Sequence, residues 1–456
     1  MDATIIESHK RQAQWHYKGG RGYQPAIARR HRRAPSATES NEADSTAKVP
    51  ESTRSRLARF LAVGPGPSIP PPTSPARTLP RDCGLSDELA NYSIRSNNLH
   101  VWIQRTVEAN VRRLVASRPV VVLTGARQTG KTSLVRHLFP KHGLVSLDLP
   151  SEAEQAEKEP SAFLARHGQP LIVDEVQYAP ALFRHLKAVV DADRARNARF
   201  ILTGSQKLAL MRSVSESMAG RAGIIELEVL TLSELRGADR KIRPLDAMVR
   251  GTLPELWEKR DLDATEFYRS YVTTYLERDL RQQLRVSSLR DFERFLRACA
   301  LRSAQVLNKA DLARDVGISP STAAEWLSAL EASNQIVLLE PWFSNRTKSL
   351  VKNPKLYLAD AGLLCFLVGI TALDELMTSP LAGPVWETFV CSELRRQIRN
   401  GERSGELLFW RDRTKEVDFV IHRGGRFELY DAKWTEHPDA GDASTLLRVE
   451  AELPRG

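Results

Sequence analysis

Short apolar runs alternate with amphipathic segments between residues 99 and 235. The runs at 119–123, 144–148, 171–173 and 200–203 each have the length of a buried strand. The segments between them carry apolar residues at helical spacing. Strands that alternate with helices form parallel sheets that are covered by helices on both faces. We therefore expect an α/β domain over this part of the chain.

The first predicted strand leads into a loop that contains two glycines. Residues 125–132 read Gly-Ala-Arg-Gln-Thr-Gly-Lys-Thr, a complete G-x-x-x-x-G-K-[ST] string, and a helix is expected over 133–139. Such a loop turns its backbone N–H groups toward phosphates, and the helix start adds partial positive charge. The alternative is a strand-to-helix turn with an incidental lysine. The residues predicted to bind ATP are Gly125, Ala126, Arg127, Gln128, Thr129, Gly130, Lys131, Thr132 and Ser133.

Two consecutive carboxylates follow the third predicted strand. Asp174 and Glu175 come directly after the apolar run 171–173. In a P-loop enzyme, Lys131 contacts the β/γ-phosphates, while Thr132 and Asp174 hold Mg²⁺. Glu175 would orient and polarise the attacking water. An Asp-Glu pair after a strand is often only a polar turn. Its position downstream of the glycine-containing loop 125–132 favours a Mg²⁺-dependent ATPase.

Further polar residues are expected near the same edge of the sheet. Ser205 or Gln206 would sense the γ-phosphate, or else they form a simple strand-ending turn. Arg221 would stabilise charge on the transferred phosphoryl group, either in its own chain or from a neighbouring subunit. The alternative is an exposed or salt-bridged arginine. A role from a neighbour would require a homo-oligomer.

Length and charge narrow the classes of protein. The chain has 456 residues, more than one ordinary hydrophobic core, and a formal net charge of +10 that suits either nucleic-acid binding or a solvated basic tail. The four cysteines form no C-x-x-C pair, which disfavours a zinc ribbon and a disulfide scaffold. The sequence shows no clean membrane span and no secretory signal core. We expect a cytoplasmic protein without a membrane partner.

The pattern over 291–345 is typical of a winged helix-turn-helix. A helix is expected over 309–316, Gly317 makes a turn, Ser319 and Pro320 open a second helix, and a strand follows at 336–339. The exposed face of the second helix carries little positive charge. Reading of DNA and a packing or hinge role both stay open.

The end of the chain resembles restriction-endonuclease-like nucleases. An amphipathic helix holds Glu387, and two neighbouring strands carry Asp418 and the triplet Asp431-Ala432-Lys433. This pattern resembles their Asp…(Asp/Glu)-x-Lys core, in which carboxylates hold Mg²⁺ and activate water against a phosphodiester. The candidate nuclease residues are Glu387, Asp418, Asp431 and Lys433. The alternative is a catalytically silent fold that docks DNA or protein.

From residue 100 onward the chain resembles a two-part family of prokaryotic AAA-type ATPases. Members of this family couple the ATPase to a C-terminal region of unknown function. The family is similar to the AAA+ and signalling NTPases. The resemblance rests on residues 121–132, 173–177, 203–206, 219–221, 251–255, 275–279 and 355–363. It implies a P-loop NTPase sheet with a winged helix and a small α/β nuclease-like domain. The expected divisions are a disordered, basic and proline-rich leader (1–95), the AAA-type P-loop ATPase (99–235), a helical linker or lid (236–290), the winged helix (291–350) and the restriction-endonuclease-like domain (351–456).

Three functional hypotheses follow. The first is an ATPase coupled to a C-terminal region that binds or cuts DNA. The second is a nucleotide-dependent switch whose C-terminal region binds DNA or protein without cleaving. The third is a DNA-binding regulator with a vestigial ATPase, which the pairing of Lys131 with Asp174 and Glu175 disfavours.

Overall fold

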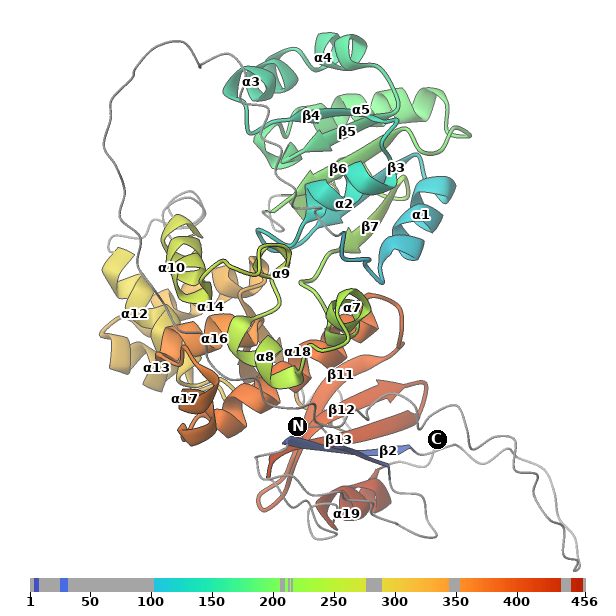
Figure 1. Cartoon of the computed structure of the whole chain (residues 1–456). Coiled ribbons are helices and arrows are strands. Elements are labelled where there is room, and N and C mark those ends of the chain that lie inside the picture. Colours follow the sequence, from blue (N-terminus) through green and yellow to red (C-terminus); the bar gives the residue numbers. More distant parts are fainter. Residues whose placement is uncertain are drawn as a thin grey trace, which may run out of the picture. The chain divides into compact units, whose positions relative to one another are not determined.

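The computed structural model of the chain describes residues 102–205, 210–211, 214, 216–275, 289–343, 353–435 and 444–453, and the backbone of strands at 4–7 and 25–31 (Figure 1). Residues 3–37 and 103–456 belong to one compact unit. Gln206 and residues 276–279, which carry part of the family resemblance, lie outside the described residues, as does most of the leader.

A parallel sheet forms the first half of the described chain. Its strand order is β4-β5-β6-β3-β7, and each neighbouring pair is parallel. The strands are β3 (Val120–Thr124), β4 (Gly143–Ser146), β5 (Leu171–Asp174), β6 (Phe200–Gly204) and β7 (Ala222–Glu226). The expected α/β fold is confirmed. The sequence analysis did not predict β7, an edge strand in which Ile224 is 45% exposed.

Helices cover both faces of this sheet, as the burial of β3 shows. Val120 and Val122 pack into one apolar cluster with residues of β5, β6 and α5, while Val121 and Leu123 are equally buried on the opposite face. The helices are α1 (Glu108–Ser117), α2 (Lys131–Leu138), α3 (Pro150–Lys158), α4 (Pro160–His167) and α5 (Leu182–Ala192), with a 3-10 turn η2 (Val176–Tyr178) after β5. The segment between β4 and β5 forms two helices, since Pro160 starts a new one.

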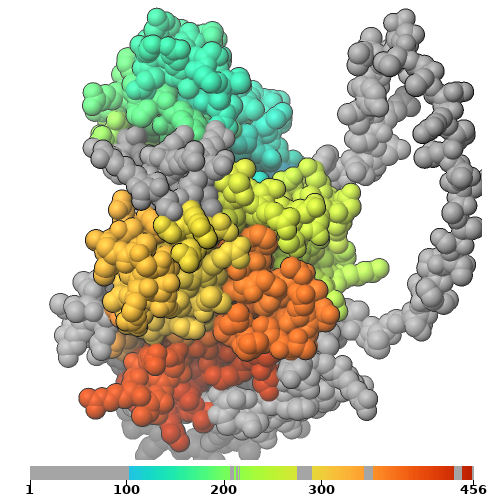
Figure 2. All heavy atoms as spheres, turned by 90° about the vertical axis from the view of Figure 1, so that its left-hand side faces the viewer, coloured from blue at the N-terminus to red at the C-terminus, as the bar shows by residue number. Residues whose placement is uncertain are grey.

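The next segment combines helices with a small antiparallel sheet. Its strand order is β8-β10-β9, and the chain runs through α12, β8, α13, α14, β9 and β10. The predicted helix over 309–316 and the start at Ser319-Pro320 are confirmed, with Asn308 and Ser319 as N-caps. The elements are α7 (Leu232–Ala238), α8 (Pro244–Arg250), α9 (Pro254–Glu258), α10 (Ala264–Tyr275), α12 (Leu289–Ala300), β8 (Gln305–Val306), α13 (Lys309–Val316), α14 (Pro320–Ala332), β9 (Ile336–Leu339) and β10 (Lys355–Leu358). On the face drawn in Figure 2, the gold segment adjoins the orange segment, in agreement with the contacts between α12 and α16 (Ala361–Val368).

A second mainly antiparallel sheet closes the described chain. Its order is β1-β2-β13-β12-β11, and α18 and α19 contact its strands. The elements are α16 (Ala361–Val368), α17 (Leu373–Thr378), α18 (Ala382–Arg399), β11 (Glu406–Arg411), β12 (Glu416–Arg423), β13 (Arg426–Trp434) and α19 (Ser444–Glu452). Among the described helices, none combines the length and apolar character needed to cross a membrane.

The N-terminal leader differs from the sequence prediction at two places. β1 (Thr4–Glu7) and β2 (Pro25–His31) are strands, and β2 pairs antiparallel with β13. A strand added to an open sheet edge is held by backbone hydrogen bonds rather than by apolar side chains. The hydrophobic pattern therefore carried no signal for these two strands.

Two glycines far apart in sequence bring the helical segments into close contact. A Cβ atom on Gly362, in α16, would lie 2.4 Å from the Cα atom of Gly251 and 2.7 Å from the hydroxyl of Tyr268. Beside them Asp360 accepts hydrogen bonds from the backbone and hydroxyl of Thr252 and from Tyr268. This junction joins two of the stretches that carry the family resemblance.

We predict that Gly362→Ala lowers the free energy of unfolding by about 1–3 kcal/mol, since backbone at 2.4 Å must shift to admit the methyl group. Gly383→Ala, also in the first turn of a helix, is the matched control, because nothing lies within 4 Å of the added Cβ. It should leave stability unchanged or raise it by up to about 1 kcal/mol. Urea denaturation measures both, and equal stability of the two variants would contradict the close contact.

Candidate nucleotide site

The loop between β3 and α2 is held in a conformation that requires glycine at its first position. Gly125 has φ +150° and Gly130 has φ +84°, and Gln128 is also left-handed at φ 60°. A Cβ atom on Gly125 would lie 2.2 Å from the carbonyl oxygen of Leu227. The loop is therefore pressed against the segment that follows β7. Ser133 lies exposed in the first turn of α2.

Lys131 points back into this loop. Its ammonium group donates hydrogen bonds to the carbonyl oxygens of Gly125 (3.1 Å) and Ala126 (2.8 Å), and the side chain is almost fully buried. A buried ammonium needs anionic or polar partners, and here the loop carbonyls supply them. A triphosphate in the loop would offer the same ammonium stronger, charged acceptors.

Asp174 lies at the end of β5, within reach of the start of α2. Its Oδ1 atom accepts a hydrogen bond from the hydroxyl of Thr132 at 2.8 Å and another from the hydroxyl of Thr203 on β6. A hydroxyl and a carboxylate in contact are the oxygen ligands that Mg²⁺ prefers. The two predicted magnesium ligands are therefore brought together. Sequence reasoning missed Thr203, whose position inside an apolar strand gave no polar signal.

Glu175 is fixed by three hydrogen bonds. It adopts a left-handed conformation at φ 53°, and its Oε2 atom accepts from the amide of Gln177, from the hydroxyl of Ser205 (3.0 Å) and from the backbone N–H of Ser205 (3.3 Å). Burial alone would raise the pKa of Glu175, but the charge of Lys131 and these hydrogen bonds outweigh it. The pKa lies below its ordinary value, so the group is an anion at neutral pH.

A buried arginine outside the predicted set tethers the loop. Arg105, upstream of α1, donates to the carbonyl oxygens of Thr129 (3.0 Å) and Glu228 (2.6 Å) and forms an ion pair with Glu234. Burial lowers the pKa of Arg105, although Glu234 opposes that effect. The loop also closes on itself, because the hydroxyl of Thr129 donates to the carbonyl of Ala126 at 3.0 Å. No sequence motif identifies Arg105, since its partners are 24 to 129 positions away.

Arg221 does not join the phosphate loop within one chain. It precedes β7, whose first residue pairs with Val120 at the start of β3, whereas the loop follows the other end of that strand. The length of β3 therefore separates Arg221 from the loop by roughly 15 Å. Arg221 instead forms a bidentate ion pair with Asp191 of α5 at 2.7 and 2.9 Å, which holds the pKa of that carboxyl at about 2.

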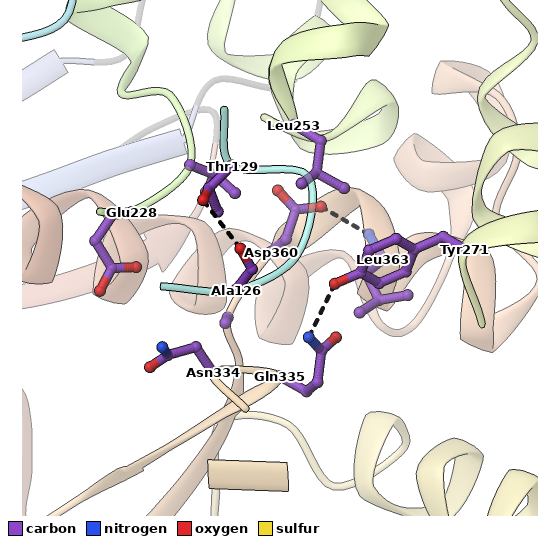
Figure 3. Close-up of a pocket in the computed structure, with 11 residues that line it drawn as sticks. Ala126, Thr129, Glu228, Leu253, Tyr271, Asn334, Gln335, Asp360 and Leu363 are labelled. Atoms are coloured by element: carbon purple, nitrogen blue, oxygen red, sulfur yellow. Dashed lines mark hydrogen bonds between the residues drawn. The ribbon is translucent and has the colours of Figure 1, made fainter. Parts of the chain in front are cut away.

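A pocket opens beside the loop. Figure 3 shows Ala126 and Thr129 on one side of it and residues of the helical segment on the other, with a hydrogen bond of 2.9 Å from the Gln335 amide to the Tyr271 hydroxyl. Its lining residues are Ala126, Thr129, Glu228, Val229, Leu253, Tyr271, Asn334, Gln335, Ala359, Asp360 and Leu363. The phosphate loop thus shares a pocket with residues more than 100 positions downstream.

Glu228 extends this connection to α18. Glu228 forms ion pairs with Arg395 (3.2 Å) and Arg399 (2.6 Å) of α18. Arg399 also forms an ion pair with Glu226 of β7 at 2.6 Å. Arg396, between them, donates to the carbonyl of Leu230 at 2.9 Å. The edge of the parallel sheet is therefore connected to α18 by ion pairs.

The candidate nuclease residues also converge, but around a lysine that sequence reasoning missed. Lys355 of β10 forms ion pairs with Glu387 (2.9 Å), Asp418 (3.2 Å) and Glu416, and its side chain is 2% exposed. Lys433 pairs with Asp431 at 2.9 Å. Within the described part of the chain, no group of three or more His, Cys, Asp or Glu residues is placed to hold a metal ion. The nuclease metal site stays a prediction.

Burial raises the pKa of two of these carboxyl groups, those of Glu387 and Asp431. It raises the pKa of Glu387 to about 7, with repulsion from Asp418 adding to the effect and Lys355 opposing it. Burial and the neighbouring Asp418 raise the pKa of Asp431 to about 8. Burial alone would lower the pKa of Lys355, but the surrounding carboxylates outweigh it and place the pKa above its ordinary value. Lys355 is therefore a cation at neutral pH.

Family models match three successive parts of the chain. Residues 117–236 match an AAA domain, residues 244–374 match a domain of unknown function (DUF8612), and residues 382–455 match another (DUF4143). The expected AAA-type ATPase domain is confirmed. The winged helix and the restriction-endonuclease-like domain stay predictions.

Known proteins resemble most of the chain. The uncharacterized proteins Rv2008c of Mycobacterium tuberculosis and Mb2031c of Mycobacterium bovis are each 31% identical over 360 residues, covering 77% of this chain and 78% of theirs. Among solved structures, the Walker-type ATPase PABY2304 of Pyrococcus abyssi matches with 17% identity and a TM-score of 0.41, covering 57% of this chain and 94% of that one.

Proposed function

Because this chain belongs to the family of the mycobacterial proteins Rv2008c and Mb2031c and carries an AAA domain, we propose that it is a Mg²⁺-dependent ATP hydrolase that acts as a nucleotide switch. The observation that carries this proposal is the convergence of three predicted groups at one sheet edge. The Lys131 ammonium, the Thr132–Asp174 pair and the Glu175 carboxylate come from β3, α2 and β5.

The chain's own residues divide the work of hydrolysis. Lys131 exchanges the loop carbonyls for phosphate oxygens when ATP binds. Thr132 and Asp174 would hold Mg²⁺, which supplies positive charge against the phosphates. Glu175 orients the attacking water, and its hydrogen bonds from Gln177 and Ser205 keep the carboxylate directed into the site. In this proposal Ser205 is the polar group that responds to the γ-phosphate.

The switch is favoured over DNA cleavage by what lies next to the loop. The pocket at Ala126 and Thr129 is completed by Asn334, Gln335 and Asp360, so a bound nucleotide would touch the segment that matches the first domain of unknown function. A ligand that binds one arrangement of this pocket better than another shifts the population between them. The nucleotide state would thereby set the arrangement of the downstream segments.

DNA reading by α14 receives little support. Its exposed residues are Pro320, Ser321, Glu325, Ser328 and Glu331, which place two carboxylates and no cation on the surface where phosphates would lie. The alternative role for the segment 291–345, as a packing or hinge module, fits the position of Asn334 and Gln335 in the wall of the pocket. If Arg221 is an arginine finger, it serves the site of a second copy of the chain and must first leave Asp191.

We predict that Glu175→Gln retains ATP binding and lowers the rate of ATP hydrolysis at least about 100-fold, because the amide cannot accept a proton from water. Glu154→Gln is the matched control, since that glutamate is exposed and pairs with Lys158 at the surface. Phosphate release and binding of a labelled ATP analogue are measured on both. Wild-type turnover in Glu175→Gln would remove this residue from the mechanism.

Hydrogen exchange tests the switch. With Mg²⁺ and a non-hydrolysable ATP analogue, amides at 334–336 and 360–363 should exchange several-fold more slowly, since they border the pocket beside the loop. Lys131→Ala should bind the analogue poorly and show no such protection. Protection confined to 117–236 would leave the ATPase intact and contradict the coupling.

A further inference from the structure

A buried lysine lies at the centre of the carboxylate cluster in the C-terminal part of the chain. Lys355 is among the largest fully buried side chains, and its ammonium contacts Glu387 at 2.9 Å, Asp418 at 3.2 Å and the carboxylate of Glu416. Three acids around one ammonium leave the cluster with excess negative charge. Buried charges of one sign require a cation or protons to balance them.

The same carboxylates have a second set of partners that fixes their orientation. The hydroxyl of Tyr357 donates to Glu387 at 2.7 Å, and the backbone N–H of Ala432 donates to Asp418 at 2.9 Å. Asp431 is 2% exposed, and its Oδ1 atom has no hydrogen-bond partner within the described residues. The cluster is thus preorganised around the position of the ammonium.

The cation and the acids come from different matched domains. Lys355 belongs to β10, in the segment 244–374, whereas the carboxylates lie on α18, β12 and β13 within 382–455. The resemblance to restriction-endonuclease-like nucleases implies a divalent cation among Glu387, Asp418 and Asp431. The ammonium of Lys355 instead contacts two of these three residues.

We infer that the ammonium of Lys355 takes the place of a divalent metal ion in this cluster. The segment 382–455 therefore cuts no phosphodiester by a metal-dependent route in this arrangement. The positive charge that balances the carboxylates comes from within the chain, and these ion pairs connect β10 with α18 and β12. The inference is independent of ATP hydrolysis at the other site.

Binding of Mn²⁺ by the full chain tests this inference without any assay of activity. Each protein carries Asp174→Asn, which removes the candidate metal ligand of the nucleotide site, and no nucleotide is added. Lys355→Met keeps the length of the side chain and removes its charge. It should bind one Mn²⁺ at least tenfold more tightly than the parent protein, measured by electron paramagnetic resonance, and its melting temperature should rise when Mn²⁺ replaces EDTA.

The control is Lys259→Met, because that exposed lysine pairs with Glu255 at the surface, in a different part of the chain from the clustered acids. It should bind Mn²⁺ as the parent does. Adding Asp418→Asn to Lys355→Met should abolish the gained site. Equal Mn²⁺ binding by the Lys355→Met and parent proteins would overturn the inference.

A second measurement keeps the inference testable if Lys355→Met does not fold. The parent protein is titrated with Mn²⁺ beside its Asp418→Asn variant. Equal binding by the two supports a cluster already filled by the ammonium. A Mn²⁺ site in the parent that Asp418→Asn removes would show a metal bound despite Lys355 and would overturn the inference.

Discussion

The parallel alignment of β5, β6 and β3 is the constraint on which the candidate site depends. The three strands end at one edge of the sheet, so the loop after β3 and the acids after β5 meet across the end of β6. Thr203 on β6 completes the contact by donating to Asp174, which also receives Thr132. Without this alignment, Lys131 and Thr132 could not share a ligand with Asp174 and Glu175, which lie about forty residues downstream.

Local chemistry allowed much of this to be predicted from the sequence. The loop 125–132, the acids after 171–173 and the capped helices of 309–332 each carry their signal within a few residues, because glycine, proline and capping side chains act on the adjacent backbone. Those elements lie where the pattern indicated. The clustering of Glu387, Asp418 and Asp431 also followed, since strand alternation and adjacency bring them together.

What the sequence did not reveal depends on partners distant along the chain. Arg105 and Lys355 are buried cations whose side-chain acceptors lie 24 or more positions away. Arg105 stands in no motif, and the stretch 355–363 that carries the family resemblance assigns no role to Lys355. β2 is held by backbone pairing to the edge of another sheet, which leaves no hydrophobic pattern. The close approach of Gly251 and Gly362 likewise exists only once the helices have packed.

The two sites differ in how they balance buried charge. In the carboxylate cluster, Lys355 supplies the cation from within the chain and fills the position. In the loop, the carbonyl oxygens of Gly125 and Ala126 accept hydrogen bonds from Lys131, whose charge also lowers the pKa of Glu175. The phosphates of ATP would offer this ammonium further charged acceptors, whereas the ammonium of Lys355 already lies among the carboxylates that would hold a metal ion.

The most direct test is a structure determined with Mg²⁺ and a non-hydrolysable ATP analogue. The account predicts that the Lys131 ammonium leaves the carbonyls of Gly125 and Ala126 for the phosphates, while the Thr132 hydroxyl turns from Asp174 to the metal ion. An analogue bound elsewhere, with Lys131 still on the loop carbonyls, would contradict it.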